Sequence, residues 1–458
     1  MFRFLAPAFV ATAVLVAPIS ATVAQAESLA DAMAMAYKNS NLLDKQAATL
    51  RAADEDVAQA VSSLRPVINA ALSSDYQRGQ TTANGAFSDG ISTTFNLSAS
   101  LLLLDFGRRE TRIAMAKETV LLTRETLTKV EQNVLLGAVA AYVDVMVKGQ
   151  IIDLRNSNVR LVTQELRAAQ DRFEVGEITK TDVSIAEARL AAAKAELSAA
   201  EGAMLIARES YKAATGQYPG HLTSLSRAPK LPASLEAARS VALKTHPDVK
   251  IAQRAVTIAD LAVDLSKADF RPTVSATARA SINDRGIESQ SFGLSLNQEL
   301  YSGGRKASVL RQSIAKNDGA RADLSQAAVN VSEAVGTAWA NLLVANATVE
   351  AGDRQIRASQ TAFDGVREEA RLGTRTTLEV LDAEQELLNA KVSRLQSEAN
   401  RYIGVYNVLA SMGLLTVQHL GLGVATYDPE TYYNRVKTAP VHSAQGKKLD
   451  RILDKLGR

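Results

Sequence analysis

The sequence predicts a mainly α-helical protein with a small β part, and three observations support this fold class. A residue pattern around Gly176 recurs 197 positions later around Gly373, so the chain is an internal duplication. Long proline-free stretches repeat their apolar residues with a period of about 3.5, which is typical of coiled-coil helices. Each half also contains segments in which apolar and polar residues alternate, which is typical of β-strands. We therefore expect two similar halves that share one body.

Residues 1–26 are interpreted as a secretory signal peptide and are excluded from the predicted fold. Arg3 precedes a long apolar run, and Ala24-Gln25-Ala26 has the small-x-small pattern that signal peptidases cleave. The chain contains no cysteine, so an exported protein of this sequence has neither disulfide bonds nor a lipid-bearing cysteine. Its 52 basic and 49 acidic residues are spread along the chain, which argues against a nucleic-acid-binding surface.

The first repeat is predicted to span residues 27–215. Pro66 separates its helical start from its strands, because proline cannot continue a helix. The polar segment 77–90, which contains several glycines, is expected to be the loop of the hairpin. The predicted elements are helices at about 28–39 and 41–64, a β-hairpin at about 67–103, a long helix at about 107–173 and a return helix at about 179–214.

The second repeat is predicted to span residues 234–415, after a linker at 216–233 that is rich in glycine and proline. A tail at 416–458 follows and ends in a basic segment. The predicted elements of this repeat are a β-hairpin at about 273–301, a long helix at about 304–370 and a return helix at about 376–412.

The long helices set the expected height of the molecule. A helix of roughly 65 residues is ~100 Å long, which is several times the length of a globular helix. Each return helix is about half as long, and a shorter helix from the start of a repeat would complete the same height. We therefore expect a wall of helices of common height.

The hairpin strands have the length and the alternation of transmembrane β-strands. After the signal, no run approaches the ~18 apolar residues of a membrane-spanning helix, so strands would have to cross any membrane. A hairpin packed on a soluble core would alternate in the same way, and this alternative stays open. Four strands cannot close a barrel: two copies would give eight strands, and three would give twelve with space for a channel.

Motifs in both halves resemble the TolC-like family of outer-membrane efflux and secretion proteins, in particular its type I secretion branch. The resemblance covers essentially the whole mature chain. The matching stretches are LDFGRR at 104–109, VGEITKTDV at 175–183, LYSGGRK at 300–306, LGTRTTLEVLDA at 372–383 and YDPETYY at 427–433.

This resemblance implies a homotrimer in the outer membrane of a Gram-negative bacterium. Four strands from each copy would complete a twelve-stranded barrel, and the helices would form an α-barrel tunnel across the periplasm. A periplasmic adaptor and an inner-membrane transporter, either ATP-driven (ABC) or proton-driven, would open it to export proteins by type I secretion, small toxic compounds (multidrug export), or both. The residues alone leave a second class open, a periplasmic coiled-coil structural or adaptor protein without a pore.

The resemblance also assigns roles to residues near the second reversal. Glu379 and Asp382 lie three residues apart on one helical face and match the acidic ring of the closed periplasmic gate. Asp182 and Arg375 match polar links that hold the entrance shut, whereas a tyrosine of these links is replaced by Ala370. Without the resemblance, all four charged residues would be read as ordinary solvated surface.

The reversals are expected both to cap the long helices and to contact the adaptor, and a helix cap alone is the alternative. These tip residues are Val175, Gly176, Glu177, Leu372, Gly373 and Thr374. No enzyme is predicted, because Asp105-Phe106-Gly107 and the Ser313 to Lys316 spacing lack every companion motif of the enzymes that use them. No cofactor or metal is expected, since the four histidines are isolated in the sequence.

Overall fold

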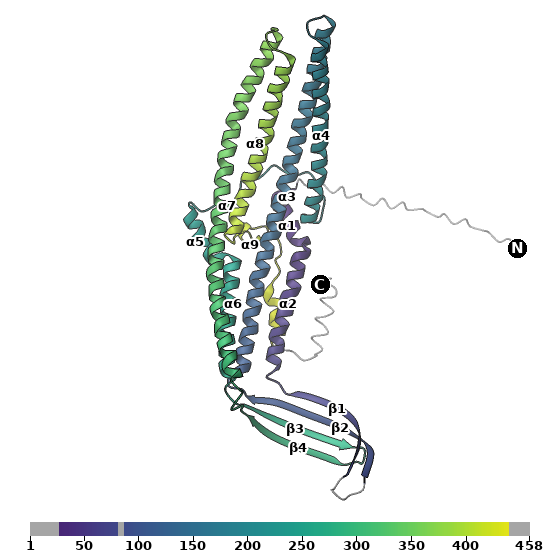
Figure 1. The fold of residues 1–458 in the computed structure, drawn as a ribbon, viewed down its shortest axis with the longest axis vertical. Helices are drawn as coiled ribbons and strands as arrows, with labels where there is room; N and C mark the ends of the chain where they lie inside the picture. Colours follow the sequence, from purple (N-terminus) through teal and green to yellow (C-terminus); the bar gives the residue numbers. More distant parts are fainter. Residues whose placement is uncertain (1–26, 81–86, 439–458) are drawn as a thin grey trace, which may run out of the picture.

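The computed structural model describes residues 27–80 and 87–438, which form an elongated molecule (Figure 1). A tall helical body carries one antiparallel sheet at its lower end in this view. The described residues are mostly helical, which confirms the predicted mainly α fold with a small β part. The predicted signal peptide and the basic end of the tail lie outside the described residues.

The elements follow the same order in the two halves. The first half consists of α1 (Leu29–Asn39), α2 (Asn41–Ser62), β1 (Val67–Gln80), β2 (Phe87–Leu104), α3 (Arg108–Glu174) and α4 (Lys180–Thr215). The second half consists of α5 (Leu235–Thr245), α6 (Pro247–Ala268), β3 (Thr273–Asn283), β4 (Glu288–Asn297), α7 (Arg305–Arg371) and α8 (Thr377–Ser411). Two short helices, α9 (Val417–Leu420) and α10 (Pro429–Val436), complete the described chain.

The two longest helices, α3 and α7, each have 67 residues and therefore extend ~100 Å. Helices α2 and α4 pack along successive parts of α3, and α6 and α8 do the same along α7 (Figure 1). Helix α3 also contacts α6 and α8, so the two halves are joined side by side. The described helices thus form the wall that the helix lengths suggest.

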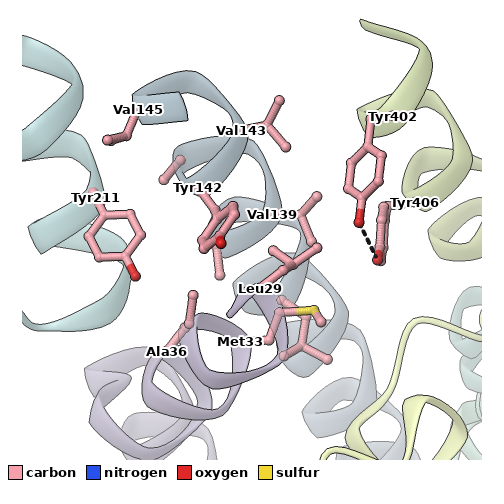
Figure 2. Packing of buried hydrophobic residues seen from close by; sticks show 14 of the residues in the cluster. Leu29, Met33, Ala36, Val139, Tyr142, Val143, Val145, Tyr211, Tyr402 and Tyr406 are labelled. Atoms are coloured by element: carbon pink, nitrogen blue, oxygen red, sulfur yellow. Dashed lines mark hydrogen bonds between the residues drawn. The ribbon is translucent and has the colours of Figure 1, made fainter. Parts of the chain in front are cut away.

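The largest hydrophobic cluster lies where α1, α3, α4 and α8 meet (Figure 2). Tyr142 of α3 is fully buried there, and its hydroxyl donates to the carbonyl oxygen of Thr223 at 2.8 Å. Helix α3 contains a stretch that is long and apolar enough to cross a membrane, contrary to the expectation from the sequence. The residues Leu135 to Val147 supply much of this cluster, which accounts for the apolar stretch as the core of the helical body.

The sheet has the strand order β1-β2-β3-β4, and all of its pairs are antiparallel. Strands β2 and β3 come from different halves and pair in the middle, with Leu97 opposite Ala280. The expected loop at 77–90 is wrong for most of its length, because the ladder continues through Gly79 and pairs Gln77 with Gly90. Backbone groups form this ladder, so glycines can take part in it although glycines in a sequence are typical of loops.

The register places the large apolar side chains of the four strands on one face of the sheet. The opposite face carries mainly Ser, Thr and Asn, and Ser275 and Ser295 are hydrogen-bonded across it at 2.8 Å. The apolar face is not covered within the chain, and ten of its large residues are between 42% and 75% exposed. They are Ile68, Leu72, Tyr76, Ile91, Phe95, Leu97, Ile282, Phe292, Leu294 and Leu296.

Candidate site at the helical tips

The two helix reversals form the tips of the molecule, at the end furthest from the sheet (Figure 1). Gly176 closes the first tip with φ of 78° and Gly373 closes the second with φ of 77°. Their N–H groups donate to the carbonyl oxygens of Phe173 and Ala370, at 3.0 and 3.1 Å. Glycine accepts the left-handed conformation because it has no Cβ atom. Both tips are therefore closed in the same way, by a glycine in the left-handed conformation.

Both tips expose apolar side chains to solvent. Leu372 is 80% exposed and Val175 is 72% exposed, and the neighbouring Thr374 and Glu177 are exposed as well. Large apolar side chains that remain exposed at the end of a structure are typical of surfaces that contact a partner. The role of the tips in adaptor binding stays a prediction, and their exposure is consistent with it.

Each return helix starts with a capping box. Thr179 accepts from the N–H of Asp182 while the Asp182 carboxylate accepts from the N–H of Thr179, and Thr376 and Glu379 form the same pair. Asp182 and Glu379 are therefore equivalent residues of the two repeats. Hydrogen bonds from Thr179 lower the pKa of Asp182, and those from the Thr376 backbone and from Arg375 lower the pKa of Glu379. Both carboxylates are ionised at neutral pH.

Arg375 forms its ion pairs within the second tip. Its guanidinium binds the carboxylates of Glu369 at 2.8 Å and Glu379 at 2.9 Å. The chain does not bring Arg375 and Asp182 together, since Asp182 binds Thr179 at the other tip. A link between Asp182 and Arg375 would have to join two copies of the chain, and it stays a prediction.

Asp382 lies one helical turn after Glu379 and is exposed, whereas Glu379 is partly buried. Its carboxylate accepts from the guanidinium of Arg189, which joins α8 to α4. Within one chain, each of the two carboxylates assigned to the gate thus has a basic partner. The acidic ring stays a prediction that depends on how several copies are arranged.

Ala370 is buried behind the second tip, where it packs in a cluster with Phe363, Val380 and Leu387. Beside it lies a cavity of about 310 Å³ between α3, α7 and α8. The side chains of Arg172, Arg367, Arg371 and Glu165 line this cavity together with smaller residues. The space beside Ala370 is therefore bordered by positive charge rather than filled by an aromatic ring.

Glu384 is buried where α8 packs on α3, and only 6% of it is exposed. Its Oε1 accepts from Nδ2 of the buried Asn158 at 2.7 Å, whereas its Oε2 has no hydrogen-bond partner among the described residues. Burial raises the pKa of Glu384 to about 7, and the nearby Glu165 contributes in the same direction. This carboxyl group is a titratable element inside the contact between the two halves.

The sequence did not identify Arg189, Glu369, Asn158 or Glu384 as members of this region. For Glu384 a signal exists, because Val380, Glu384 and Leu387 are spaced by four and then three residues. That spacing places the carboxyl group on the apolar face of a coiled-coil helix. The partners Arg189 and Glu369 carry no comparable signal, since charged residues are frequent on exposed helix faces. Among the described residues, no group of three or more acidic or histidine side chains could hold a metal ion.

Comparisons with known proteins add independent information. A family model described as "Outer membrane efflux protein" matches residues 32–217 and 238–414. The chain is 36% identical over 421 residues to the outer membrane efflux protein BepC of Brucella suis biovar 1 (strain 1330), covering 90% of this chain and 91% of BepC. It is 25% identical to the outer membrane protein TolC of Escherichia coli (strain K12), covering 87% of this chain and 85% of TolC.

The fold is also similar to solved structures. The crystal structure of the Campylobacter jejuni CmeC outer membrane channel superposes with a TM-score of 0.75 at 14% identity, covering 90% of each chain. Identity at this level supports the fold alone. The fold, the family model and the relatives agree with one another over most of the chain.

Proposed function

Because the chain belongs to the outer membrane efflux protein family, we propose that three copies form a continuous channel and tunnel from the periplasm through the outer membrane. The location is the outer membrane of a Gram-negative bacterium, and the general role is efflux or secretion. The chain is not an enzyme, as the sequence indicated, because this family consists of efflux proteins.

The observation that carries this proposal is the sheet with one apolar face and two open edges. Large apolar side chains on this face are exposed, whereas the helical body packs its largest hydrophobic cluster inside. Strands β1 and β4 are edge strands in the described sheet, so each presents a row of unpaired backbone groups. Such an edge cannot persist in lipid, where every backbone group needs a hydrogen-bond partner. Pairing of β4 with β1 of another copy would give the backbone groups of both edges their hydrogen-bond partners.

The number of copies follows from the space that a barrel must enclose. A barrel of eight strands fills its lumen with side chains, whereas a barrel of twelve strands leaves room for a channel. A protein that exports cargo needs an open lumen, so three copies of four strands are favoured. The face rich in Ser, Thr and Asn would line this lumen, and the apolar face would contact lipid.

The helices would continue this channel as an α-barrel, because α3 and α7 have equal lengths and carry their partner helices along the same axis. The tips would then form the entrance. In a threefold arrangement Glu379 and Asp382 would contribute six carboxylates to one ring, which would attract cations. Links between Asp182 of one copy and Arg375 of the next would hold this ring closed.

The proposal includes two protein partners, a periplasmic adaptor and an inner-membrane transporter. The exposed tips, with Val175 and Leu372 at their ends, would contact a periplasmic adaptor protein. An inner-membrane transporter of the ABC or proton-driven kind would supply the energy and the cargo, which consists of small toxic compounds, secreted proteins, or both. A periplasmic coiled-coil protein without a pore would leave the exposed apolar face of the sheet without a function, so no observation favours that alternative.

Disulfide crosslinking tests the entrance, because the chain has no cysteine of its own. The double variant Asp182→Cys with Arg375→Cys, purified in detergent, is expected to form crosslinks between chains under oxidising conditions. Its conductance in a planar bilayer should fall on oxidation and recover on reduction. The two single variants serve as controls. A double variant without crosslinks beyond those of the single variants would contradict the predicted link.

A further inference from the structure

A basic cavity lies where the second half passes from strand to helix, far from the tips. Its volume is about 300 Å³, and it is lined by residues of α6, β3, β4 and α7, of the segments that follow α6 and β4, and by the first residue of α3. Four basic and two acidic side chains line it, a net charge of +2. They are Arg108, Arg271, Arg305 and Lys306, with Asp269 and Glu299.

The ion pairs inside this cavity do not neutralise it. Glu299 binds Arg305 at 2.9 Å and Lys306 at 3.3 Å, so one carboxylate serves two cations. Arg108 pairs with Asp269 at 3.3 Å, and Arg271 donates to the carbonyl oxygen of Phe106 at 3.3 Å. Lys306 is also nearly buried, since only 13% of its side chain is exposed. Arg271 is exposed and the side chain of Arg305 is 63% exposed, so the excess positive charge is open to an anion from outside.

The first repeat shows how this type of junction is neutralised. There Asp105 is buried and accepts from both the N–H and the Nε of Arg109, at 2.8 and 3.0 Å. The equivalent positions in the second repeat are Ser302 and Lys306, and the N–H of Lys306 reaches the Ser302 hydroxyl only at 3.4 Å.

The first turns of the two long helices differ in the same direction. Helix α3 has Glu110 in its first turn, whereas α7 has Ala307 at the equivalent position and no acidic residue in that turn. The second junction therefore lacks these two carboxylates, and Glu299, whose equivalent in the first repeat is Leu102, is the carboxylate that Arg305 and Lys306 share.

The surroundings indicate where an anion would come from. Large apolar side chains next to the cavity are exposed, among them Tyr301 at 87%, Leu300 at 91% and Phe270 at 43%. Aromatic residues beside basic ones at the end of a membrane-spanning segment are typical of the lipid headgroup region. The junction lies between the helical body and the sheet (Figure 1). If the sheet crosses the membrane as proposed, that is the level of the periplasmic headgroups.

We propose that this cavity binds a phosphate group, supplied by the headgroup of an anionic phospholipid at the periplasmic face of the outer membrane. Arg305 and Lys306 bind the phosphate oxygens, and Arg108 and Arg271 border the site on its other side. Guanidinium groups suit this ligand because they offer paired donors to its oxygens. The proposal depends on the proposed function only for the position of the sheet in the membrane.

The test titrates the detergent-purified mature protein with phosphatidylglycerol, phosphatidylcholine or inorganic phosphate and follows binding by native mass spectrometry and thermal shift. Arg305→Ala with Lys306→Ala should weaken phosphatidylglycerol binding at least about tenfold, because two charge-assisted contacts are lost. Glu299→Gln should strengthen it severalfold, because the competing carboxylate is removed. Arg354→Ala is the matched control, since Arg354 lies further along α7 and pairs with Glu350.

The outcomes separate the possible sources of the phosphate. Preference for phosphatidylglycerol over phosphatidylcholine, with no displacement by millimolar inorganic phosphate, supports the lipid. Equal protection by inorganic phosphate would keep the phosphate site and overturn the lipid as its source. Unchanged affinity in both the double variant and Glu299→Gln would overturn the site itself, and a gain in affinity cannot result from misfolding. Loss of lipid binding in a variant that still conducts would leave the proposed function intact.

Discussion

Replacement of Glu384 by glutamine tests how a buried carboxyl group affects the contact between the two halves. Glu384 lies between α8 and α3 with one oxygen bound to Asn158 and the other unpartnered. Glutamine keeps the shape of the side chain and the acceptor for Asn158, but it cannot ionise. The variant therefore isolates the effect of the charge.

The magnitude follows from the pKa of Glu384, which burial raises from 4.5 to about 7. This difference corresponds to roughly 3 kcal/mol between the protonated and the ionised forms. Because the pKa is raised, the contact is most stable below pH 4.5 and loses stability as the pH rises towards 7. Above pH 7 its stability no longer changes with pH. The glutamine amide places two N–H donors where Oε2 of Glu384 has no partner, at a cost of about 1 kcal/mol. At pH 8 the net gain of the variant is therefore about 2 kcal/mol.

Hydrogen exchange of the α8 peptides around residue 384, corrected for the intrinsic effect of pH, measures this contact locally. At pH 8 these amides should exchange roughly thirtyfold more slowly in Glu384→Gln than in the wild type, and the gain should disappear at about pH 5, where the effect of the charge no longer exceeds the cost of the unpaired amide donors. Glu187→Gln is the matched control, because Glu187 is the exposed equivalent of Glu384 in the first repeat. Equal pH dependence of the wild type and Glu384→Gln would refute the reasoning.

Two further predictions concern the tips. Gly373→Ala should destabilise the second tip by roughly 1 kcal/mol, measured as faster local hydrogen exchange, because the residue has φ of 77°. Gly365→Ala, within α7 and with open space for a Cβ atom, should instead stabilise the helix by about 1 kcal/mol, and a stabilised Gly373→Ala would contradict the first expectation. The double variant Glu379→Ala with Asp382→Ala should show weaker block of single-channel current by divalent cations, and unchanged block would argue against the acidic ring.

The coarse fold could be predicted because its signals are long. A period of 3.5 residues over the end of α3 and over α4, the glycines at both reversals and the alternation in the strands are each visible in a local stretch of sequence. The repeat of 197 residues doubles every one of these signals. The extent of the first hairpin was harder to predict, because Gly79 and Gly90 are typical loop residues although they take part in the ladder of the strands.

The surroundings of the apolar stretch of α3 also could not be predicted from the sequence. The length and composition of such a stretch do not reveal whether it faces lipid or neighbouring helices. The structure assigns residues such as Leu135 and Val139 to the core between α1, α3 and α4. Packing between elements that are distant in the sequence decides this question.

The candidate site was predictable only in part, because its partners are set by tertiary packing. The glycines and capping residues of the tips follow from local rules, so their positions were accessible. The pairing of Asp382 with Arg189 joins α8 to α4, and no local pattern indicates it. The acidic ring and the link between Asp182 and Arg375 are contacts between copies, which neither the sequence nor a single chain contains.

The most direct test of the central claim is the mass of the protein extracted from outer membranes in detergent, corrected for bound detergent. We predict a complex of three mature chains that needs detergent to stay in solution, because the sheet closes only when its edges pair between copies. A mature protein that is soluble and monomeric without detergent would contradict the proposed channel.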